Sequence, residues 1–555
     1  MINKAAVFHR AFGNYAYYRN NKDVYLMIRT AKNDITKLVC EYYDKYDYNK
    51  RYTVEMQKRA SCDVYDYYTT VITPPHRRLC YFFRLYKGKK EFIYKQYGFT
   101  TSAYPSDFQL AYLNPCDVFE IPSWINNSVF YQIFPDAFST YGRTTPLSKE
   151  YYGGTLKGIT KNISYLKELG INLIYLNPIF TSTTYHRYDI TDYYSIDPTL
   201  GTEQDFRDLV NTCHKNGIRI ILDAVLNHSS SNHPMFLDVL KNGKKSKYIN
   251  YYVINSFKGN KINEYDRFAF ENYMPKLNTS NLETQKYLID ILTYWIKEFD
   301  IDGWRFDVAN EIGHAFIKKI RTAIKEVKPE AFMLGEIWHD GCDFLLGDEY
   351  DGITNFTLKD LLFEYIKDNA SAKHFAEKLN RYLSSLPQQA ITSNSNFLCN
   401  HDTHRIASEI KDKNTLMSLI AIQFIFPGTP LIYYGEEIGM EHHPEHSGDK
   451  GARSLMEFDK VKNNELFEFY KKMIRLKTKN VCLSSNDYSV EGVNNLLVII
   501  RQHNNKQVKL IVNTTNKDKK IKLEGNYKNY LTNQQYNLGD KIKVLNNNFV
   551  ILVKD

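Results

Sequence analysis

Residues 303–310 read GWRFDVAN, and this stretch decides the fold because an apolar run that begins at Ile301 ends in an ionisable side chain, Asp307. An unpaired carboxylate at the end of a buried strand is costly, so a partner is expected there. Three further apolar, strand-like runs lead into acidic or amide side chains: DAVLNH (223–228), LGEIW (334–338) and FLCNHD (397–402). The pattern predicts parallel strands that lie side by side and bring three carboxylates together, Asp307, Glu336 and Asp402.

Strand-like runs alternate with helical patterns between residues 121 and 480. In 203–217, for example, apolar residues recur at helical spacing, with Thr202 as the expected N-cap and Gly217 as the stop. Strands are expected at 129–134, 171–178, 218–225, 301–308, 331–337, 352–357, 395–400 and 430–435. Eight strands that alternate with helices predict a (β/α)8 TIM barrel, whose active site lies at the C-terminal ends of its strands.

Other segments do not fit a simple barrel. Residues 229–282 are too long for an ordinary connection and are rich in Lys, Asn and Tyr, which predicts a small inserted domain over the active-site face. Short β-rich runs separated by turn residues occupy both ends of the chain. We therefore expect a multidomain protein: an N-terminal β-sandwich (1–120), the catalytic barrel (121–480) and a C-terminal β-sandwich (481–555).

Composition excludes several classes of protein. A chain of 555 residues, 43% of them hydrophobic, is long enough for several domains. The net charge of +9 comes from Lys and Arg interleaved with Asp and Glu, which argues against a nucleic-acid partner. The N-terminus lacks a signal-type apolar segment, and no apolar run is long enough to span a bilayer, so we expect no membrane association and a cytoplasmic location. The eight cysteines show no CxxC spacing, which argues against zinc or a disulfide framework.

Three converging carboxylates suit glycoside hydrolysis, which needs a carboxylate nucleophile and a protonated carboxyl group that donates to the leaving oxygen. Arg305 lies two residues before Asp307 on the same strand face, so it is expected to keep Asp307 ionised. Glu336 has no cation two positions away and is flanked by Ile337 and Trp338. Desolvation is therefore expected to raise the pKa of Glu336 and make it the acid.

Any one of these carboxylates, taken alone, is as well explained as a helix cap or a surface charge. The set is harder to explain in this way, because it is flanked by His228, Arg305 and His401. A metal site is disfavoured, since the histidines show no HxH or HExxH spacing.

The segments DAVLNH, GWRFDVANE, LGEIWHD and FLCNHDTHR resemble the four signature regions of the α-amylase family, glycoside hydrolase family 13. Two further segments, MPKLN (274–278) and VANE (308–311), are similar to those of the group that contains neopullulanase, cyclomaltodextrinase and maltogenic amylase. YQIFPDAF (131–138), HRYDITDY and GTPLIYYGEEIGM (428–440) extend the resemblance over nearly the whole chain.

The resemblance implies a role for individual residues. Asp307 is expected to be the nucleophile, Glu336 the general acid/base and Asp402 the stabiliser of the transition state. Tyr188 is expected to stack on the sugar in the cleaved position. The other substrate-binding residues implied are His228, Arg305, His401 and, on the non-reducing side, Asp449 and Arg453.

The loop that binds calcium in some members of the family has different residues in this sequence. Family members that bind calcium near the first barrel strand use a loop rich in Asn and Asp. Here that loop carries Arg143 and Lys149, has no carboxylate before Glu150, and has Thr155 after the paired glycines. Calcium prefers several oxygen ligands, carboxylates among them, so no metal and no other cofactor are expected. Asn227, whose equivalent contributes to some calcium sites of the family, does not change this expectation.

The expected activity is retaining hydrolysis of α-1,4 bonds in cyclodextrins, pullulan or maltooligosaccharides, with some transglycosylation. Resemblance further implies a homodimer in which the N-terminal domain narrows the partner's active site. Two alternatives remain: an enzyme of the same fold that transfers or isomerises glucosyl units, and an inactive carbohydrate-binding scaffold.

Overall fold

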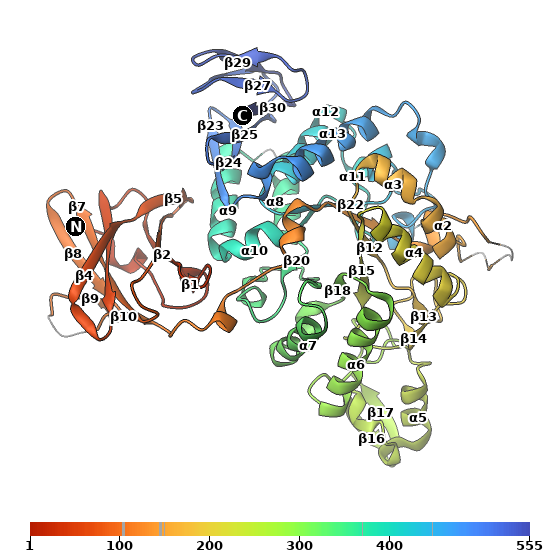
Figure 1. Ribbon diagram of the computed structural model, residues 1–555. Helices are drawn as coiled ribbons and strands as arrows, with labels where there is room; N and C mark the ends of the chain where they lie inside the picture. Colours follow the sequence, from red (N-terminus) through yellow and green to blue (C-terminus); the bar gives the residue numbers. More distant parts are fainter. Residues whose placement is uncertain (103–105, 144–146, 149, 369, 447, 555) are drawn as a thin grey trace.

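The computed structural model describes residues 1–102, 106–143, 147–148, 150–368, 370–446 and 448–554. Lys149, in the loop discussed above, lies outside the described residues. Figure 1 shows an N-terminal β-body to one side of a central α/β body, with a C-terminal β-body above it. In the part of the chain that is described, no helix combines the length and apolar character needed to cross a membrane.

The central body is a parallel β-barrel, as predicted. Its sheet has the strand order β20-β19-β18-β15-β12-β11-β22-β21 among the described residues. A parallel bridge between Thr354 and Ser395 joins the two ends and closes the ring. The strands are β11 (Phe130–Ile133), β12 (Leu173–Leu176), β15 (Arg219–Ala224), β18 (Gly303–Phe306), β19 (Phe332–Gly335), β20 (Gly352–Ile353), β21 (Ser395–Phe397) and β22 (Thr429–Tyr433).

Helices surround the barrel, and α4 (Glu203–Lys215) begins at the N-cap that its sequence predicts, Thr202. This helix starts with a capping box in which Thr202 and Asp205 satisfy each other's backbone amides. Helix α6 (Leu282–Phe299) buries an apolar stripe that includes Trp295 and ends at Asp300 in the left-handed conformation. The outer layer also contains α2 (Leu156–Lys161), α3 (Ile163–Leu169), α7 (His314–Val327), α8 (Phe356–Lys367), α9 (Ala372–Ser385), α10 (Gln388–Ser393), α12 (Lys413–Ile425) and α13 (Glu465–Lys479).

The strand predicted at 352–357 is shorter than expected. Strand β20 ends at Ile353, and α8 begins at Phe356. The Asn355 side chain accepts a hydrogen bond from the backbone N–H of Leu358 at 3.0 Å and so caps the helix. The apolar residues that follow Asn355 belong to this helix, and a short apolar run alone does not distinguish helix from strand.

Two segments that extend from the barrel, the insertion and a β-hairpin, form part of its active-site face. The predicted insertion contains α5 (Pro234–Asn242) and the hairpin of β16 (Ile254–Lys258) and β17 (Lys261–Tyr265), which Figure 1 shows together at one end of the molecule. It returns to the barrel through an isolated bridge between His228 and Lys276. A second hairpin, which the sequence did not reveal, pairs β13 (Phe180–Ser182) with β14 (Ile190–Ile196).

The N-terminal body is a β-sandwich. One sheet has the order β1-β2-β6-β5 and the other β4-β3-β7-β8-β9, with β10 paired to β7. A separate apolar cluster, which includes Leu26, Leu38 and Phe83, fills the space between them. The strands are β1 (Ala16–Tyr18), β2 (Val24–Ala31), β3 (Lys37–Asp44), β4 (Asp47–Glu55), β5 (Gln57–Ser61), β6 (Tyr65–Ile72), β7 (Leu79–Lys87), β8 (Lys90–Lys95), β9 (Gly98–Phe99) and β10 (Phe108–Leu110).

The C-terminal body is also a β-sandwich, as predicted. Its larger sheet has the order β23-β24-β25-β30-β27-β28, and β26 pairs with β29 in the smaller one. Val498, Ile511 and Ile542 belong to the apolar core of this body. The strands are β23 (Asp487–Val493), β24 (Leu496–His503), β25 (Lys506–Asn513), β26 (Lys519–Lys522), β27 (Tyr527–Asn529), β28 (Gln535–Tyr536), β29 (Lys541–Val544) and β30 (Asn548–Lys554).

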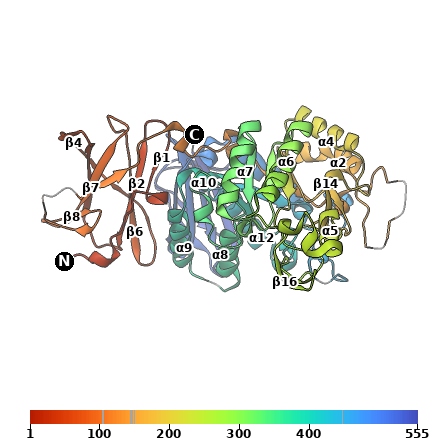
Figure 2. The same ribbon diagram turned by 90° about the horizontal axis from the view of Figure 1, so that it is seen from below.

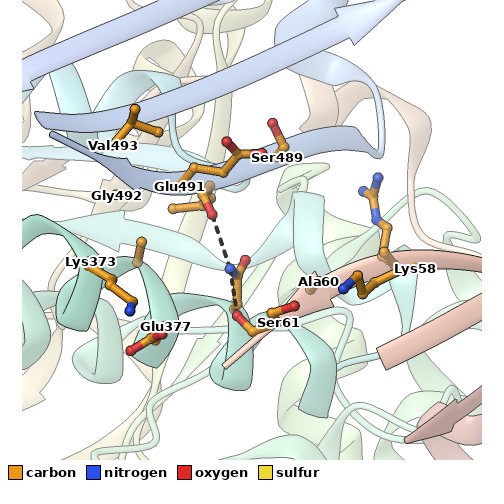
Figure 3. A pocket seen from close by; sticks show the side chains of 13 residues that line it. Lys58, Ala60, Ser61, Lys373, Glu377, Ser489, Glu491, Gly492 and Val493 are labelled. Carbon is orange, nitrogen blue, oxygen red and sulfur yellow. Dashed lines mark hydrogen bonds between the residues drawn. The ribbon is translucent and has the colours of Figure 1, made fainter. Parts of the chain in front are cut away.

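All three bodies meet at helix α9. The Asn380 side chain on this helix donates hydrogen bonds to Ser61 O in the N-terminal body at 3.1 Å and to Val490 O in the C-terminal body at 3.0 Å. Beside it lies a pocket of about 340 Å³ lined by β5, α9 and β23 (Figure 3). Figure 2 shows α9 from below, between the N-terminal strands and the rest of the barrel. The junction therefore depends on close packing against α9.

Gly492→Ala is expected to weaken this junction. A Cβ at Gly492 would lie 2.3 Å from the backbone of Lys373 on α9, so the strand or the helix must move. We expect a loss of about 1–3 kcal/mol in the free energy of unfolding. Thermal and urea unfolding of the full chain measure it.

Gly525→Ala is the matched control in the same β-body. Its added Cβ would make ordinary contact, 3.4 Å from Tyr527. Equal stability of the two variants would contradict close packing at Gly492.

Candidate active site

A cleft of about 790 Å³ opens at the C-terminal ends of the barrel strands. Most of the predicted site residues line it, and the insertion and the β13–β14 hairpin contribute its walls. The predicted residues in its lining are Tyr188, His228, Asp307, Glu336, Asp402, Asp449 and Arg453. Arg305 and His401 are fully buried and touch residues of this lining from below.

Arg305 is the centre of the charged floor. Its Nη1 donates to Asp223 Oδ1 and to Asp307 Oδ1, both at 2.8 Å. Its Nη2 forms an ion pair with Glu336 Oε1 at 2.6 Å. These residues come from the neighbouring strands β15, β18 and β19, so the order of strands in the barrel creates the cluster. One guanidinium thus faces three carboxyl groups, all of them buried, at the floor of the cleft.

This geometry extends one expectation and qualifies another. The predicted pairing of Arg305 with Asp307 is present, and Arg305 also reaches Glu336 from the adjacent strand, a contact that the sequence did not reveal. The charge of Arg305 favours the ionised form of Asp307, as expected, but burial acts in the opposite direction and has the larger effect. Burial raises the pKa of Asp307 well above its usual range, and the charge of Arg305 opposes this only in part. Burial likewise raises the pKa of Glu336.

The backbone between the two acids is strained. Val308 has φ of +44°, a conformation that is unfavourable for a β-branched residue. Its N–H donates to Glu336 Oε2 at 3.0 Å. This hydrogen bond ties the Glu336 carboxylate to the residue that follows Asp307. It therefore helps to fix the position of Glu336 relative to Asp307.

Tyr188 and His401 form a hydrogen-bonded chain across the floor. Gln132 Nε2 donates to His401 Nδ1 at 2.8 Å, which leaves His401 Nε2 as the protonated nitrogen, in contact with the Tyr188 hydroxyl. Tyr188 in turn donates to Asp223 Oδ2 at 2.9 Å. Burial lowers the pKa of His401 well below its usual range, so the ring is neutral. The chain holds the Tyr188 ring parallel to His401, with 11° between the planes.

His228 offers an unused polar atom to the cleft. Its ring stacks on Phe268 of the insertion, with 5.0 Å between centroids. Burial lowers the pKa of His228 to about 3, and its Nε2 has no hydrogen-bond partner among the described residues. Buried polar atoms are normally paired, so this nitrogen is available for a ligand hydroxyl.

Arg453 joins the last two predicted acids. Its Nη2 donates to Asp402 Oδ1 at 2.9 Å and to Asp449 Oδ2 at 3.2 Å. Its Nε donates to the backbone carbonyl of His401 at 2.9 Å. Through His401, Arg453 thus joins these two acids to the chain of Tyr188, Asp223 and Arg305.

Sequence reasoning missed several residues of the cleft. Asp223 opens the DAVLNH segment, and its position at the end of an apolar strand was the available signal. His186 lies two residues before Tyr188, and its pKa is lowered by burial to about 3. The walls also contain aromatic residues with no sequence signal of their own, Tyr185, Phe268 and Tyr273.

Comparison with known proteins identifies the chain. The family model described as "Alpha amylase, catalytic domain" matches residues 132–463, and "Alpha amylase, N-terminal ig-like domain" matches residues 1–114. The chain belongs to the α-amylase family. It is therefore a glycoside hydrolase.

Its similarity to individual α-amylase family members extends over most of the chain. A cyclomaltodextrinase from Bacillus sp is 38% identical over 506 residues, which is 87% of this chain and 90% of that protein. An intracellular maltogenic amylase from Bacillus subtilis is 38% identical and covers 86% of this chain and 85% of its own. The solved structure of a cyclomaltodextrinase superimposes with a TM-score of 0.91 at 33% identity and covers 100% of both chains.

The calcium that some α-amylase family members bind does not fit the residues present here. Arg143 Nε donates to Gly153 O at 2.6 Å, and its Nη2 donates to the carbonyls of Gly154 and Thr199. At Asn227, whose equivalent contributes to some calcium sites of the family, the side-chain Oδ1 is in contact with Lys276 Nζ. Side-chain cations thus occupy both sets of oxygens. Among the described residues, no three His, Cys, Asp or Glu side chains form a group able to hold a metal.

Buried neutral histidines predict acid sensitivity. His233 Nδ1 accepts a hydrogen bond from Met235 N at 3.2 Å and caps α5, and burial lowers its pKa to about 4. A histidine in the unfolded chain has a pKa of about 6.5. Below this pH the unfolded chain therefore binds a proton at His233, while the folded protein keeps the ring neutral. This contribution to stability is therefore complete above pH 6.5 and is lost as the pH falls toward 4.

His233→Asn keeps a capping side chain and removes the titration. We expect the stability of the variant to fall less steeply between pH 6 and 4, by about 1.4 kcal/mol per pH unit. Urea midpoints at closely spaced pH values measure the difference. Parallel curves for the two proteins would contradict a buried neutral His233.

Proposed function

We propose that the chain is a retaining α-glucan hydrolase that cleaves α-1,4 bonds in cyclodextrins, pullulan or maltooligosaccharides and performs some transglycosylation. The observation that carries the proposal is the single guanidinium of Arg305 in contact with both Asp307 and Glu336 on the floor of the cleft. Names of relatives support the substrate class, since they include cyclomaltodextrinase and maltogenic amylase.

Asp307 is the nucleophile, and Glu336 is the general acid and then the base. Burial raises the pKa of both groups, and one cation cannot balance all the carboxylates around it, so a proton stays in the cluster at neutral pH. Glu336 gives this proton to the leaving oxygen while Asp307 attacks the anomeric carbon and forms a covalent glycosyl-enzyme. Glu336 then removes a proton from water, which releases the sugar.

The remaining residues hold the substrate. Asp402, kept in place by Arg453, stabilises the charge that develops on the ring. Tyr188 stacks on the sugar, and neutral His228 and His401 meet its hydroxyls. Arg305 orients both catalytic carboxylates, and Asp449 and Arg453 contact the non-reducing side of the substrate.

A sugar hydroxyl can replace water in the second step, because the glycosyl-enzyme reacts with either. For this reason a glucosyl transferase or isomerase of the same fold is the second candidate. An inactive scaffold is disfavoured, since the three acids and their partners are all in place around the cleft. Equal amounts of enzyme on β-cyclodextrin, pullulan and soluble starch, with chromatography of the products, test the substrate. Products longer than maltotriose from maltotriose would favour transfer.

We further propose a cytoplasmic homodimer with domains at 1–120, 121–480 and 481–555, the insertion at 229–282, and no nucleic-acid or membrane partner. The relative named intracellular maltogenic amylase supports the location. Cell fractionation tests the location, and light scattering during size-exclusion chromatography tests the dimer.

Asp307→Asn is expected to abolish turnover while the fold remains intact, because the change is nearly isosteric and removes only the nucleophilic charge. We expect kcat/KM to fall on the order of 10³-fold or more. Steady-state hydrolysis and circular dichroism measure activity and folding.

Asp360→Asn provides the matched control, because Asp360 is an exposed carboxylate on α8. Activity of Asp307→Asn within tenfold of wild type, about 1.4 kcal/mol of barrier, would contradict the assignment.

Glu336→Gln is expected to be nearly inactive on natural glucans. It should retain much more of the first step on an activated aryl glycoside, whose leaving group departs without protonation. Burst-phase release of the aryl group measures this step. Equal losses on both substrates would show that Glu336 is not the acid.

A further inference from the structure

A second cluster of charges lies beside the active site, where the loop after β11 meets the segments that flank β14. It contains two guanidinium groups, Arg143 and Arg187, and two carboxylates, Asp136 and Asp197. Arg187 is fully buried. Its Nε lies 3.3 Å from Asp197 and its Nη2 lies 3.9 Å from Asp136. The two positive and two negative charges balance only while both arginines are present.

The backbone around Asp136 is arranged to expose carbonyl oxygens. The amides of Tyr152 and Gly153 donate to the Asp136 carboxylate at 2.8 and 3.2 Å. Gly154 N donates to Asp136 O at 2.6 Å, and a Cβ at Gly154 would lie 2.0 Å from the carbonyl oxygen of Pro135. This close approach requires glycine. With their amides turned toward Asp136, Gly153 and Gly154 present their carbonyls to Arg143.

The third carbonyl comes from the other segment. Thr199 O accepts from Arg143 Nη2, while the Thr199 hydroxyl accepts from Arg187 Nη2 at 2.7 Å. Thr199 N donates to Asp197 Oδ1 at 2.8 Å, which fixes the direction of the turn. Three neutral oxygens from two segments thus converge on one guanidinium, with two carboxylates behind them. A divalent metal ion would prefer the same kind of oxygen surroundings.

We propose that Arg143 is an internal cation that fills a divalent-cation site of its own chain, so that the enzyme is metal-independent while the site remains latent. The guanidinium balances Asp136 and Asp197 together with Arg187 and ties the turn at 152–154 to Thr199. Loss of its charge leaves one cation against two carboxylates, with three carbonyl oxygens facing the space. Such a site binds a calcium-sized dication.

The site also supports the active-site floor. Arg187 has φ of +62°, in the left-handed region that is unfavourable for a residue with a side chain, and it immediately precedes Tyr188. Arg187 Nη1 donates to Tyr185 O at 2.7 Å. Arg143 is therefore linked to the segment that carries Tyr185 and Tyr188 through Thr199 and Arg187.

The test compares wild type, Arg143→Ala and Arg143→Gln, each as the full chain, in EDTA, in millimolar calcium and in millimolar magnesium. Wild type should keep one Tm in all three solutions. Both variants should lose about 2–5 °C in EDTA and regain it in calcium, because an ion that binds only the folded state stabilises it. Calorimetric titration with calcium should give a one-site binding curve for the variants and none for wild type.

Two further variants sharpen the result. Arg143→Lys keeps a positive charge and should lose less stability, with no response to calcium. Arg207→Ala removes a half-exposed arginine that donates to the carbonyl of Glu298, and it should not respond to calcium either.

Several outcomes overturn the proposal. The proposal fails if Arg143→Ala and Arg143→Gln are as stable as wild type in EDTA, or if calcium does not restore their Tm. A calcium response of wild type would show that a metal binds with the guanidinium in place. An equal calcium response of Arg207→Ala would show that the effect is not specific to Arg143.

Discussion

The active site depends on the imbalance between the single Arg305 guanidinium and the three carboxyl groups around it. If Asp223, Asp307 and Glu336 were all ionised, the cluster would carry a net charge of −2, which is unfavourable for side chains with so little exposed surface. The imbalance favours retention of a proton. The barrel sets this condition, because Asp223, Arg305 and Glu336 come from β15, from β18 and from the end of β19, which are neighbours in the sheet.

Side-chain cations lie at three places where oxygen atoms converge on this face of the barrel. Arg305 lies among carboxylates, Arg143 faces backbone carbonyls, and Lys276 contacts Asn227 and Glu311. A covalently attached cation is present at fixed stoichiometry, so its effect does not vary with the ion content of the solution. Its geometry is less adaptable than that of a hydrated ion, since a guanidinium donates only in its own plane.

Much of the architecture was predictable because the decisive signals are local. Apolar runs mark all eight barrel strands, and Asp307, Glu336 and Asp402 follow three of them. The contact between Arg305 and Glu336 was not predictable, because it depends on which strands are adjacent and on where each ends. The β13–β14 hairpin was missed for a related reason: its strands pair with register shifts, which interrupt regular alternation.

Helix α9 has a consequence for the order of folding. The N-terminal β-sandwich has an apolar core of its own, so its strands can pack while the rest of the chain is still being synthesised. Its place on the barrel does not exist until Asn380 emerges from the ribosome, and the second bond of Asn380 waits for Val490. The three bodies can therefore take their final places only after most of the chain has been made, through contacts of very long sequence separation, whose formation carries a loop-closure entropy cost.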